Sequence, residues 1–227
     1  MKGSRGCPKS RLLPPDPSPG VSRPAGSPKA ALSPAGIAEI LMNRPSACNA
    51  LGNVLVNQLL EALAQLREDQ QVRVLLFRSG VKGVFCAASS AVMGLIETTR
   101  GLLPGAGGTQ RLPRCIGVAL AKELIFTGRR LNGAQAQALG LVNHTVSQNE
   151  DGNAAYHRAR ELAQEILPQA PIAVRLGKVA IDRGMEVDIA SGMAIEGICY
   201  AQNIPTQDRL EGMAAFREKR PPRFVGK

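Results

Sequence analysis

Tryptophan is absent from the 227-residue sequence, and all aromatic residues together make up only 3% of it. The hydrophobic core must therefore be aliphatic, and the aromatic platforms on which single-stranded nucleic acids or sugars stack are not expected. No apolar run reaches the length that a membrane-spanning helix needs. The composition thus argues against a membrane span and against recognition of nucleic acid by stacking.

Several familiar catalytic motifs are also missing. The five cysteines never form C-x-x-C, which indicates reduced thiols in an intracellular compartment. Only two histidines are present, His144 and His157, and surface or capping positions fit them better than metal ligation. There is no H-E-x-x-H and no G-x-S-x-G, and Gly105, Gly107 and Gly108 match neither the dinucleotide fingerprint nor the P-loop. We expect no metal and no cofactor.

The net charge of +10 is concentrated at the two ends of the chain. Residues 1–36 contain six basic residues and one acid, and residues 209–227 contain six basic residues and two acids, which leaves +1 for the body between them. A nucleic-acid-binding face on the body is therefore not expected. The basic C-terminal segment suits a compact polyanion such as the phosphates of a nucleotide-bearing substrate, or it is a solvated charged tail.

The chain divides into a leader, a core and a helical lobe. Residues 1–36 hold eight of the 16 prolines, which predicts a disordered leader. Its low acid content is typical of a mitochondrial presequence, although the prolines oppose the amphipathic helix of such a segment, so a cytosolic location stays open. We expect an α/β core over residues 37–168 and a helical lobe over residues 169–227.

Hydrophobic periodicity predicts the individual elements. Strands are expected at 37–43, 72–77 and 83–87, with a helix within 49–69 between the first two. Further helices are expected at 117–128, near 133, and at 154–167, 172–184, 187–203 and 206–220. The sheet should therefore lie in the N-terminal half of the chain.

One carboxylate stands out beside a glycine-rich stretch. Glu97 is preceded by the apolar AVMGLI and followed by GLLPGAGGTQRLPR, residues 101–114. Such a stretch is typical of a sharp loop that enters a helix. A glutamate that leaves an apolar strand next to a glycine-lined cleft is a candidate general acid or base, and a surface glutamate at a strand end is the alternative.

These residues resemble the enoyl-CoA hydratase/isomerase (crotonase) family. The resemblance rests on LMNRPSACNALG, on IETTRGLLPGAGGTQRLPRCIG running into ELIFTGRRLNGAQAQALGLVNHTV, and on GMAAFREKRPPRFVGK, and it covers residues 37–227. It implies an α/β crotonase-like ββα spiral with a C-terminal helical oligomerisation lobe, a homo-oligomer (trimer or hexamer), an acyl-CoA thioester as substrate, and a mitochondrial location.

The resemblance also implies roles for single residues. Glu97 matches the second catalytic glutamate, which exchanges a proton at the substrate α-carbon, and Ala87 matches the first oxyanion-hole donor. Gly105 matches backbone that shapes the acyl pocket. Phe216 and Lys219 match positions that touch the CoA nucleotide.

The family pattern is interrupted between Ala87 and Ala88. After F-C-A the family continues with two further ββα units, about 60 residues at roughly 30 per unit, which carry the first catalytic glutamate and the second oxyanion donor. Their absence indicates an internal deletion of the kind that alternative splicing produces. We therefore expect a hydratase-family protein of acyl-CoA metabolism with low or absent activity, or a non-catalytic subunit of family oligomers.

Overall fold

The computed structural model describes residues 29–33, 36–47, 49, 52–81 and 92–227. The chain forms two compact units. One contains Ala38–Asp69 and Leu75–Arg160 together with the first strand, and the other contains Ser33–Ile37, Gln70–Val74 and Glu161–Lys227. Each unit is considered separately below.

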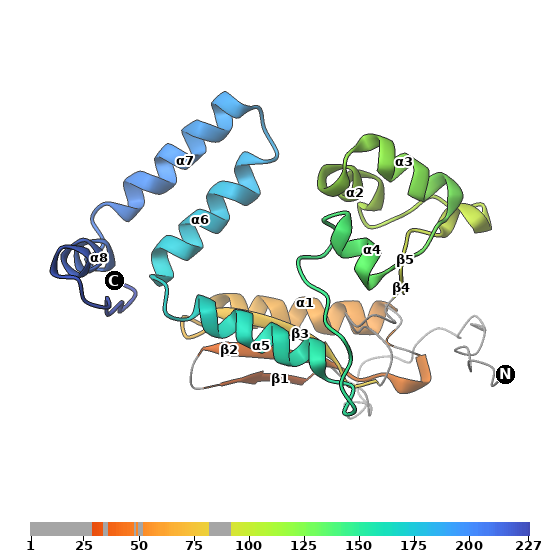
Figure 1. Cartoon of the computed structure of the whole chain (residues 1–227), viewed down its shortest axis with the longest axis horizontal. Helices are drawn as coiled ribbons and strands as arrows, with labels where there is room; N and C mark the ends of the chain where they lie inside the picture. The colour runs from red at the N-terminus through yellow and green to blue at the C-terminus, as the bar shows by residue number, and fades with distance from the viewer. Residues whose placement is uncertain (1–28, 34–35, 48, 50–51, 82–91) are drawn as a thin grey trace. The chain divides into compact units, whose positions relative to one another are not determined.

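A three-stranded sheet opens the described chain, in the order β1-β2-β3 (Figure 1). It consists of β1 (Lys29–Leu32), β2 (Ile37–Met42) and β3 (Val74–Ser79). β1 pairs antiparallel with β2, while the Gly36 carbonyl accepts from Val74 N–H and the Met42 carbonyl from Gly80 N–H, so β2 and β3 run in the same direction. The crossover between them contains α1 (Asn53–Glu68), as expected for a strand-helix-strand unit.

Strand β1 corrects part of the predicted leader. Residues 29–32 were expected to belong to an irregular, proline-rich segment, yet they pair with β2 in the register Lys29↔Leu41 to Leu32↔Ala38. The local reason is that the segment KAAL contains no proline, so each residue can donate its backbone N–H to a ladder. The proline frequency of the leader as a whole concealed this short exception.

The alternation along β2 places its two faces in different surroundings. Ile37, Ala38, Ile40 and Met42 are buried, and they form part of the aliphatic core. Glu39 instead accepts hydrogen bonds from the Tyr156 hydroxyl at 2.7 Å and from Arg160 at 3.0 Å. These bonds hold the first half of α5 (Ala154–Ile166) against the sheet (Figure 1).

The middle of the chain folds around its own small core. Its elements are β4 (Val92–Met93), the 3₁₀ turn η2 (Glu97–Arg100), α2 (Gly108–Ile116), α3 (Val118–Thr127), β5 (Leu131–Asn132) and α4 (Gly133–Ala138). β4 and β5 pair antiparallel, and Leu124, Leu131 and Ala136 form the buried centre. The side chain of Asn132 caps α4 through Gln135 N–H at 2.9 Å, which explains why that short helix begins where it does.

Three helices complete the second unit: α6 (Pro171–Gly184), α7 (Ile189–Asn203) and α8 (Gln207–Glu218). α6 and α7 form a hairpin, drawn in cyan and blue in Figure 1. Asp188 caps α7 by accepting from Ala190 and Ser191 N–H, and the added bond from the Ser191 hydroxyl lowers the pKa of that carboxyl. No helix in the described part of the chain is long and apolar enough to cross a membrane.

The helices predicted from periodicity are confirmed, as are the strands expected at 37–43 and 72–77. For these elements only the ends differ, by a few residues. α2 and β5 were not predicted. The strand expected at 83–87 lies outside the described residues. A 3₁₀ turn, η1 (Pro45–Ala47), also forms in the segment before α1.

Candidate functional site

Glu97 is the first residue of η2, four residues after β4 ends. Its Oε2 atom is buried and has no hydrogen-bond partner among the residues that the structure describes. Buried polar atoms are nearly always hydrogen-bonded, because leaving them unpaired costs about 1–3 kcal/mol. An exception of this kind needs an explanation, and a group that is kept free for a substrate provides one.

The turn that carries Glu97 is fixed to the end of α3. The Thr98 hydroxyl donates to the Ile125 carbonyl at 2.6 Å, and the Thr99 hydroxyl donates to the Ile96 carbonyl at 2.7 Å. Gly128 ends α3 with φ of 59°, and a Cβ at this position would collide with Thr99 Cγ2. η2 and the end of α3 are therefore in such close contact that only glycine fits between them.

The glycine-rich stretch forms a turn that begins α2. Pro104 is buried, Ala106 and Gly107 both have positive φ (51° and 81°), and the Gly105 carbonyl accepts from Gly108 N–H at 2.9 Å. An added Cβ at Gly108 would come within 3.2 Å of Leu95 and Pro104 side-chain atoms, whereas at Gly105 it would meet nothing within 4 Å. The predicted loop-to-helix turn is confirmed, and Gly105 leaves open space beside it.

An apolar pocket of about 260 Å³ lies next to this turn. One face of α2 borders it, through residues spaced at i, i+3, i+4 and i+7: Gly108, Arg111, Leu112 and Cys115. The other walls come from β4, β5 and α3 with their flanking residues, and from the segment after α4: Met93, Gly94, Leu95, Leu124, Arg129, Leu131 and Leu141. Neither Glu97 nor Gly105 lines it, so this pocket is separate from the predicted catalytic carboxylate.

The two predicted CoA contacts lie at the end of α8. Phe216 has 82% of its surface exposed, and Lys219 is the left-handed C-cap of the helix, with φ of 55°. The backbone N–H of Lys219 donates to the Phe216 carbonyl at 3.3 Å. Both side chains are accessible to a ligand, and the tight cap fixes the backbone that links them.

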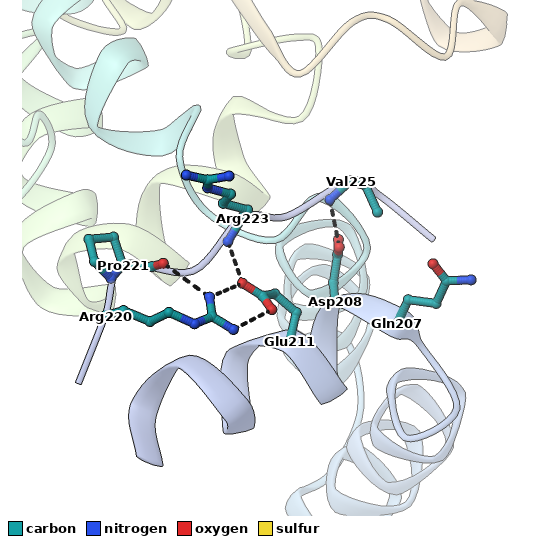
Figure 2. Close-up of a pocket in the computed structure, with 7 residues that line it drawn as sticks. All are labelled: Gln207, Asp208, Glu211, Arg220, Pro221, Arg223 and Val225. Carbon is teal, nitrogen blue, oxygen red and sulfur yellow. Dashed lines mark hydrogen bonds and ion pairs between the residues drawn. The ribbon is translucent and has the colours of Figure 1, made fainter. Parts of the chain in front are cut away.

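The segment after α8 is held back onto that helix by two carboxylates (Figure 2). Asp208, only 2% exposed, accepts from Val225 N–H at 2.7 Å and from Gly226 N–H at 2.8 Å. Glu211 accepts two bonds from the guanidinium of Arg220, at 2.6 and 2.9 Å, and one from Arg223 N–H at 2.8 Å. We call these two carboxylates and the tail that they bind, residues 220–227, the C-terminal clamp.

Residues of the clamp line an open pocket of about 590 Å³, and their hydrogen bonds shift the pKa of Glu211. Hydrogen bonds from Arg220 and from the Arg223 backbone lower the pKa of Glu211 to about 2. Arg220 also pairs with Glu218 at 2.6 Å, so its charge is satisfied within the chain. This arginine is therefore not available to a polyanion, while the guanidinium of Arg223 points away from Glu211 in Figure 2.

The structure thus places Glu97 and Gly105 in one unit and Phe216 and Lys219 in the other. Ala87, the predicted oxyanion donor, lies outside the described residues. Sequence reasoning missed Thr98, which anchors the Glu97 turn, and Arg111, which faces the apolar pocket. The spacing of the α2 residues could have revealed Arg111, whereas the bond made by Thr98 spans 27 residues and has no local signal.

No cluster of three or more histidine, cysteine, aspartate or glutamate side chains suited to a metal ion occurs within the ranges that the structure describes. His144 and His157 are both exposed.

Comparison with known proteins gives consistent matches. A family model described as enoyl-CoA hydratase/isomerase matches residues 33–90 and 87–227. The chain is 70% identical over 251 residues to bovine "Enoyl-CoA hydratase domain-containing protein 2, mitochondrial", covering 84% of this chain and 85% of that one. It is 42% identical over 251 residues to human "Methylglutaconyl-CoA hydratase, mitochondrial", covering 84% and 74%. The crystal structure of enoyl-CoA hydratase from Bacillus anthracis matches with a TM-score of 0.83 and 32% identity, over 88% of this chain and 100% of that one.

The length of the bovine alignment carries further information. Since 84% of 227 residues is about 191, about 60 of the 251 aligned positions have no residue in this chain. The two matches to the family model meet at residues 87–90.

Proposed function

Because the chain belongs to the enoyl-CoA hydratase/isomerase family, we propose that it binds acyl-CoA thioesters, that Glu97 is its proton-exchanging carboxylate, and that hydration is impaired in this form. The likeness to the Bacillus anthracis enzyme confirms the predicted α/β crotonase-like fold. The observation that carries the proposal is the buried Oε2 of Glu97, which has no hydrogen-bond partner among the described residues.

Glu97 would exchange the proton at the α-carbon of the substrate. Adding water across a 2-enoyl thioester requires an activated water at the β-carbon, a proton at the α-carbon, and stabilisation of the enolate oxygen. A carboxylate oxygen with no internal hydrogen bond can accept or deliver that proton without first breaking a bond. Thr98 would position the group, because its bond to Ile125 fixes the turn on which Glu97 lies.

We propose that the rest of the machinery is missing because of an internal deletion at Ala87–Ala88. Support comes from the two family-model matches that meet there and from the roughly 60 aligned positions without a residue in this chain. Ala87 would supply one oxyanion donor, and the absent segment would have supplied the other donor and the first glutamate. Losing an oxyanion donor typically lowers the rate by about 10²–10³, and losing an acid or base by about 10²–10⁴.

The nucleotide part of CoA would bind at the end of α8. Phe216 is exposed and suited to contact an aromatic base, and Lys219 offers an ammonium group to phosphates. Arg220 is excluded from this role because Glu211 and Glu218 already hold its guanidinium. Only part of the basic charge of the C-terminal segment would therefore contact the ligand.

A direct test measures hydration of crotonyl-CoA by the loss of its conjugated ultraviolet absorbance, with the bovine relative as reference. We expect kcat/KM to be lower than that of the reference by at least about 10². A rate equal to the reference would overturn the proposed impairment. Exchange of the α-protons of butyryl-CoA in D₂O, followed by NMR, isolates the Glu97 step, and Glu97→Gln should abolish any exchange that the chain retains.

Binding is tested separately from turnover. Thermal unfolding with and without CoA should show stabilisation that grows with CoA concentration. The double variant Phe216→Ala/Lys219→Gln should lose this shift, while Lys178→Gln, on the exposed surface of α6, should keep it. The absence of any shift would contradict the CoA-binding part of the proposal.

A non-catalytic role in family oligomers is the second candidate, and the helical hairpin favours it. α6 and α7 expose many large apolar side chains: Ile181, Met185, Ile189, Met193 and Ile198. Such a surface is typical of an interface. Co-expression with the bovine relative followed by size-exclusion chromatography tests this role, and separate elution of the two chains would count against it.

We also propose a mitochondrial location, since the bovine, mouse and human relatives are named mitochondrial. Protease protection of the chain in isolated mitochondria, with and without detergent, would test it. Recovery in the cytosolic fraction would support the alternative.

A further inference from the structure

The apolar pocket beside α2 has the features of a small binding site. Two of its leucines, Leu124 and Leu131, are only 4% exposed and belong to the core of this region, so the walls are built on packed structure. At Gly94 an added Cβ would come within 2.8 Å of the Arg129 carbonyl. Close contact between the backbone segments on two sides thus limits how far the pocket can collapse.

The size of the pocket suits one short apolar group. Its volume, about 260 Å³, exceeds the roughly 150 Å³ of an engineered cavity that binds benzene, and it is below the roughly 300–1,000 Å³ of sites for drug-sized ligands. Leucine and methionine side chains dominate the lining. A single unbranched hydrocarbon chain fits these limits.

Two arginines add a charge preference. Arg129 forms an ion pair with Glu123 at 2.8 Å, so its charge is largely satisfied. Arg111 lines the same pocket, and no ion pair or side-chain hydrogen bond ties it to another residue in the described part of the chain. A guanidinium next to a leucine-lined hollow matches a ligand with an anionic group at one end of an apolar chain.

We propose that this pocket binds an unbranched medium-chain aliphatic carboxylate, with the chain among Leu112, Leu124 and Leu131 and the carboxylate at Arg111. The site does not include Glu97 or Gly105, and it does not rest on the proposed hydratase chemistry. The free carboxylate also distinguishes its ligand from an acyl thioester, which has no negative charge at that end.

Cys115 allows a direct test on the unmodified chain. Its thiol is free, exposed and at the edge of the pocket, whereas the thiol of Cys199 in α7 is buried. Alkylation by iodoacetamide, resolved by peptide mass spectrometry, should slow at least about fivefold at Cys115 in octanoate well above its Kd, and butyrate should protect less. Cys199 serves as the internal reference. No protection by octanoate, with circular dichroism unchanged, would overturn the proposal and would fit a pocket that another polypeptide fills.

The role of the charge is tested by a matched pair of variants. Arg111→Gln should weaken octanoate binding about tenfold and leave the binding of neutral 1-octanol unchanged. Arg114→Gln is the control, because Arg114 lies on the same helix, is exposed, bonds to Gln110 and does not line the pocket. Equal losses in the two variants, or equal affinity of the wild-type chain for octanoate and octanol, would overturn the assignment of the carboxylate to Arg111.

Discussion

Two carboxylates of this chain are withdrawn from solvent in contrasting ways. Asp208 is almost fully buried, and its two oxygens each accept a backbone N–H from the tail. Glu97 has one buried oxygen that accepts nothing from the described residues. The first arrangement stabilises the folded chain, whereas the second leaves a polar atom unpaired at a cost in stability.

This difference distinguishes Asp208, whose role is structural, from Glu97, the candidate catalytic residue. Asp208 lies in the first turn of α8, where the helix dipole also favours a negative charge. Glu97 lies on a turn that Thr98 and Gly128 hold tightly, so its position is fixed although no described residue bonds that oxygen. Residues kept in this state at the expense of stability are characteristic of functional sites.

Removing the buried structural acid should have the largest effect. Asp208→Ala leaves the N–H groups of Val225 and Gly226 without their acceptor, and we expect the free energy of unfolding to fall by about 3 kcal/mol. Urea denaturation followed by circular dichroism measures the change. Asp208→Asn retains one acceptor and should lose less. A loss below that of an exposed substitution such as Asp182→Ala would contradict the role of the clamp.

The second largest loss of stability is expected from a change at Gly128, where the end of α3 contacts the turn that carries Glu97. Gly128→Ala introduces a collision with Thr99 Cγ2 at a residue with positive φ, and should cost about 2 kcal/mol. The double variant Thr99→Ser/Gly128→Ala removes the colliding methyl and keeps the hydroxyl that donates to Ile96. Thermal unfolding should therefore recover part of the loss. If the double variant instead lost as much stability as the two single variants combined, the collision with Thr99 would not be the cause of the Gly128→Ala loss.

Replacing the candidate catalytic residue, Glu97, should increase stability instead of reducing it. Glu97→Gln replaces a carboxylate whose buried oxygen has no partner in the described part of the chain, and we expect the free energy of unfolding to rise by about 1 kcal/mol. Glu123→Gln is the matched control, because that exposed acid pairs with Arg129 and should give no gain. A destabilisation by Glu97→Gln as large as that of Asp208→Ala would assign Glu97 a structural role.

The smallest expected effect concerns the pH dependence of the clamp. Because the folded-state pKa of Glu211 is lowered to about 2, its contribution to stability is complete above the ordinary value of 4.5 and is lost as pH falls toward 2. Glu211→Gln should flatten the pH profile of urea denaturation in this window. The effect should be modest since the group is accessible to solvent. An unchanged profile would show that the Arg220 pair does not contribute.

Local patterns in the sequence were sufficient for most of the elements. The stripe of Leu55 and Leu59 in α1, for example, repeats at the helical period, and the buried run in β2 is rich in isoleucine. β1 was missed because its pairing with β2 depends on residues six to twelve positions away, while its local surroundings are proline-rich. Tertiary pairing, rather than propensity, determines that strand.

For the candidate site residues, too, local features could be predicted from the sequence and tertiary contacts could not. The position of Glu97 beside a glycine-rich turn was predicted from local sequence and family resemblance, and its burial could not be. The basic tail was predicted to bind a polyanion or to be a solvated tail. In the structure Arg220 is instead held by Glu211, nine residues earlier, and by Glu218. Charge counts record the number of arginines but not which acids face them once the chain has folded.

Because the Asp208 carboxylate accepts its hydrogen bonds from the tail, the environment of this buried group depends on whether residues 225–227 are present. Val225, Gly226 and Lys227 meet α8 through backbone groups, including the bond from Asp208 N–H to the Lys227 carbonyl at 3.1 Å. Gly226 also has a positive φ of 75°, so both the presence of these residues and the glycine among them matter. Trimming by a carboxypeptidase that removed these three residues would leave a buried carboxylate without its donors.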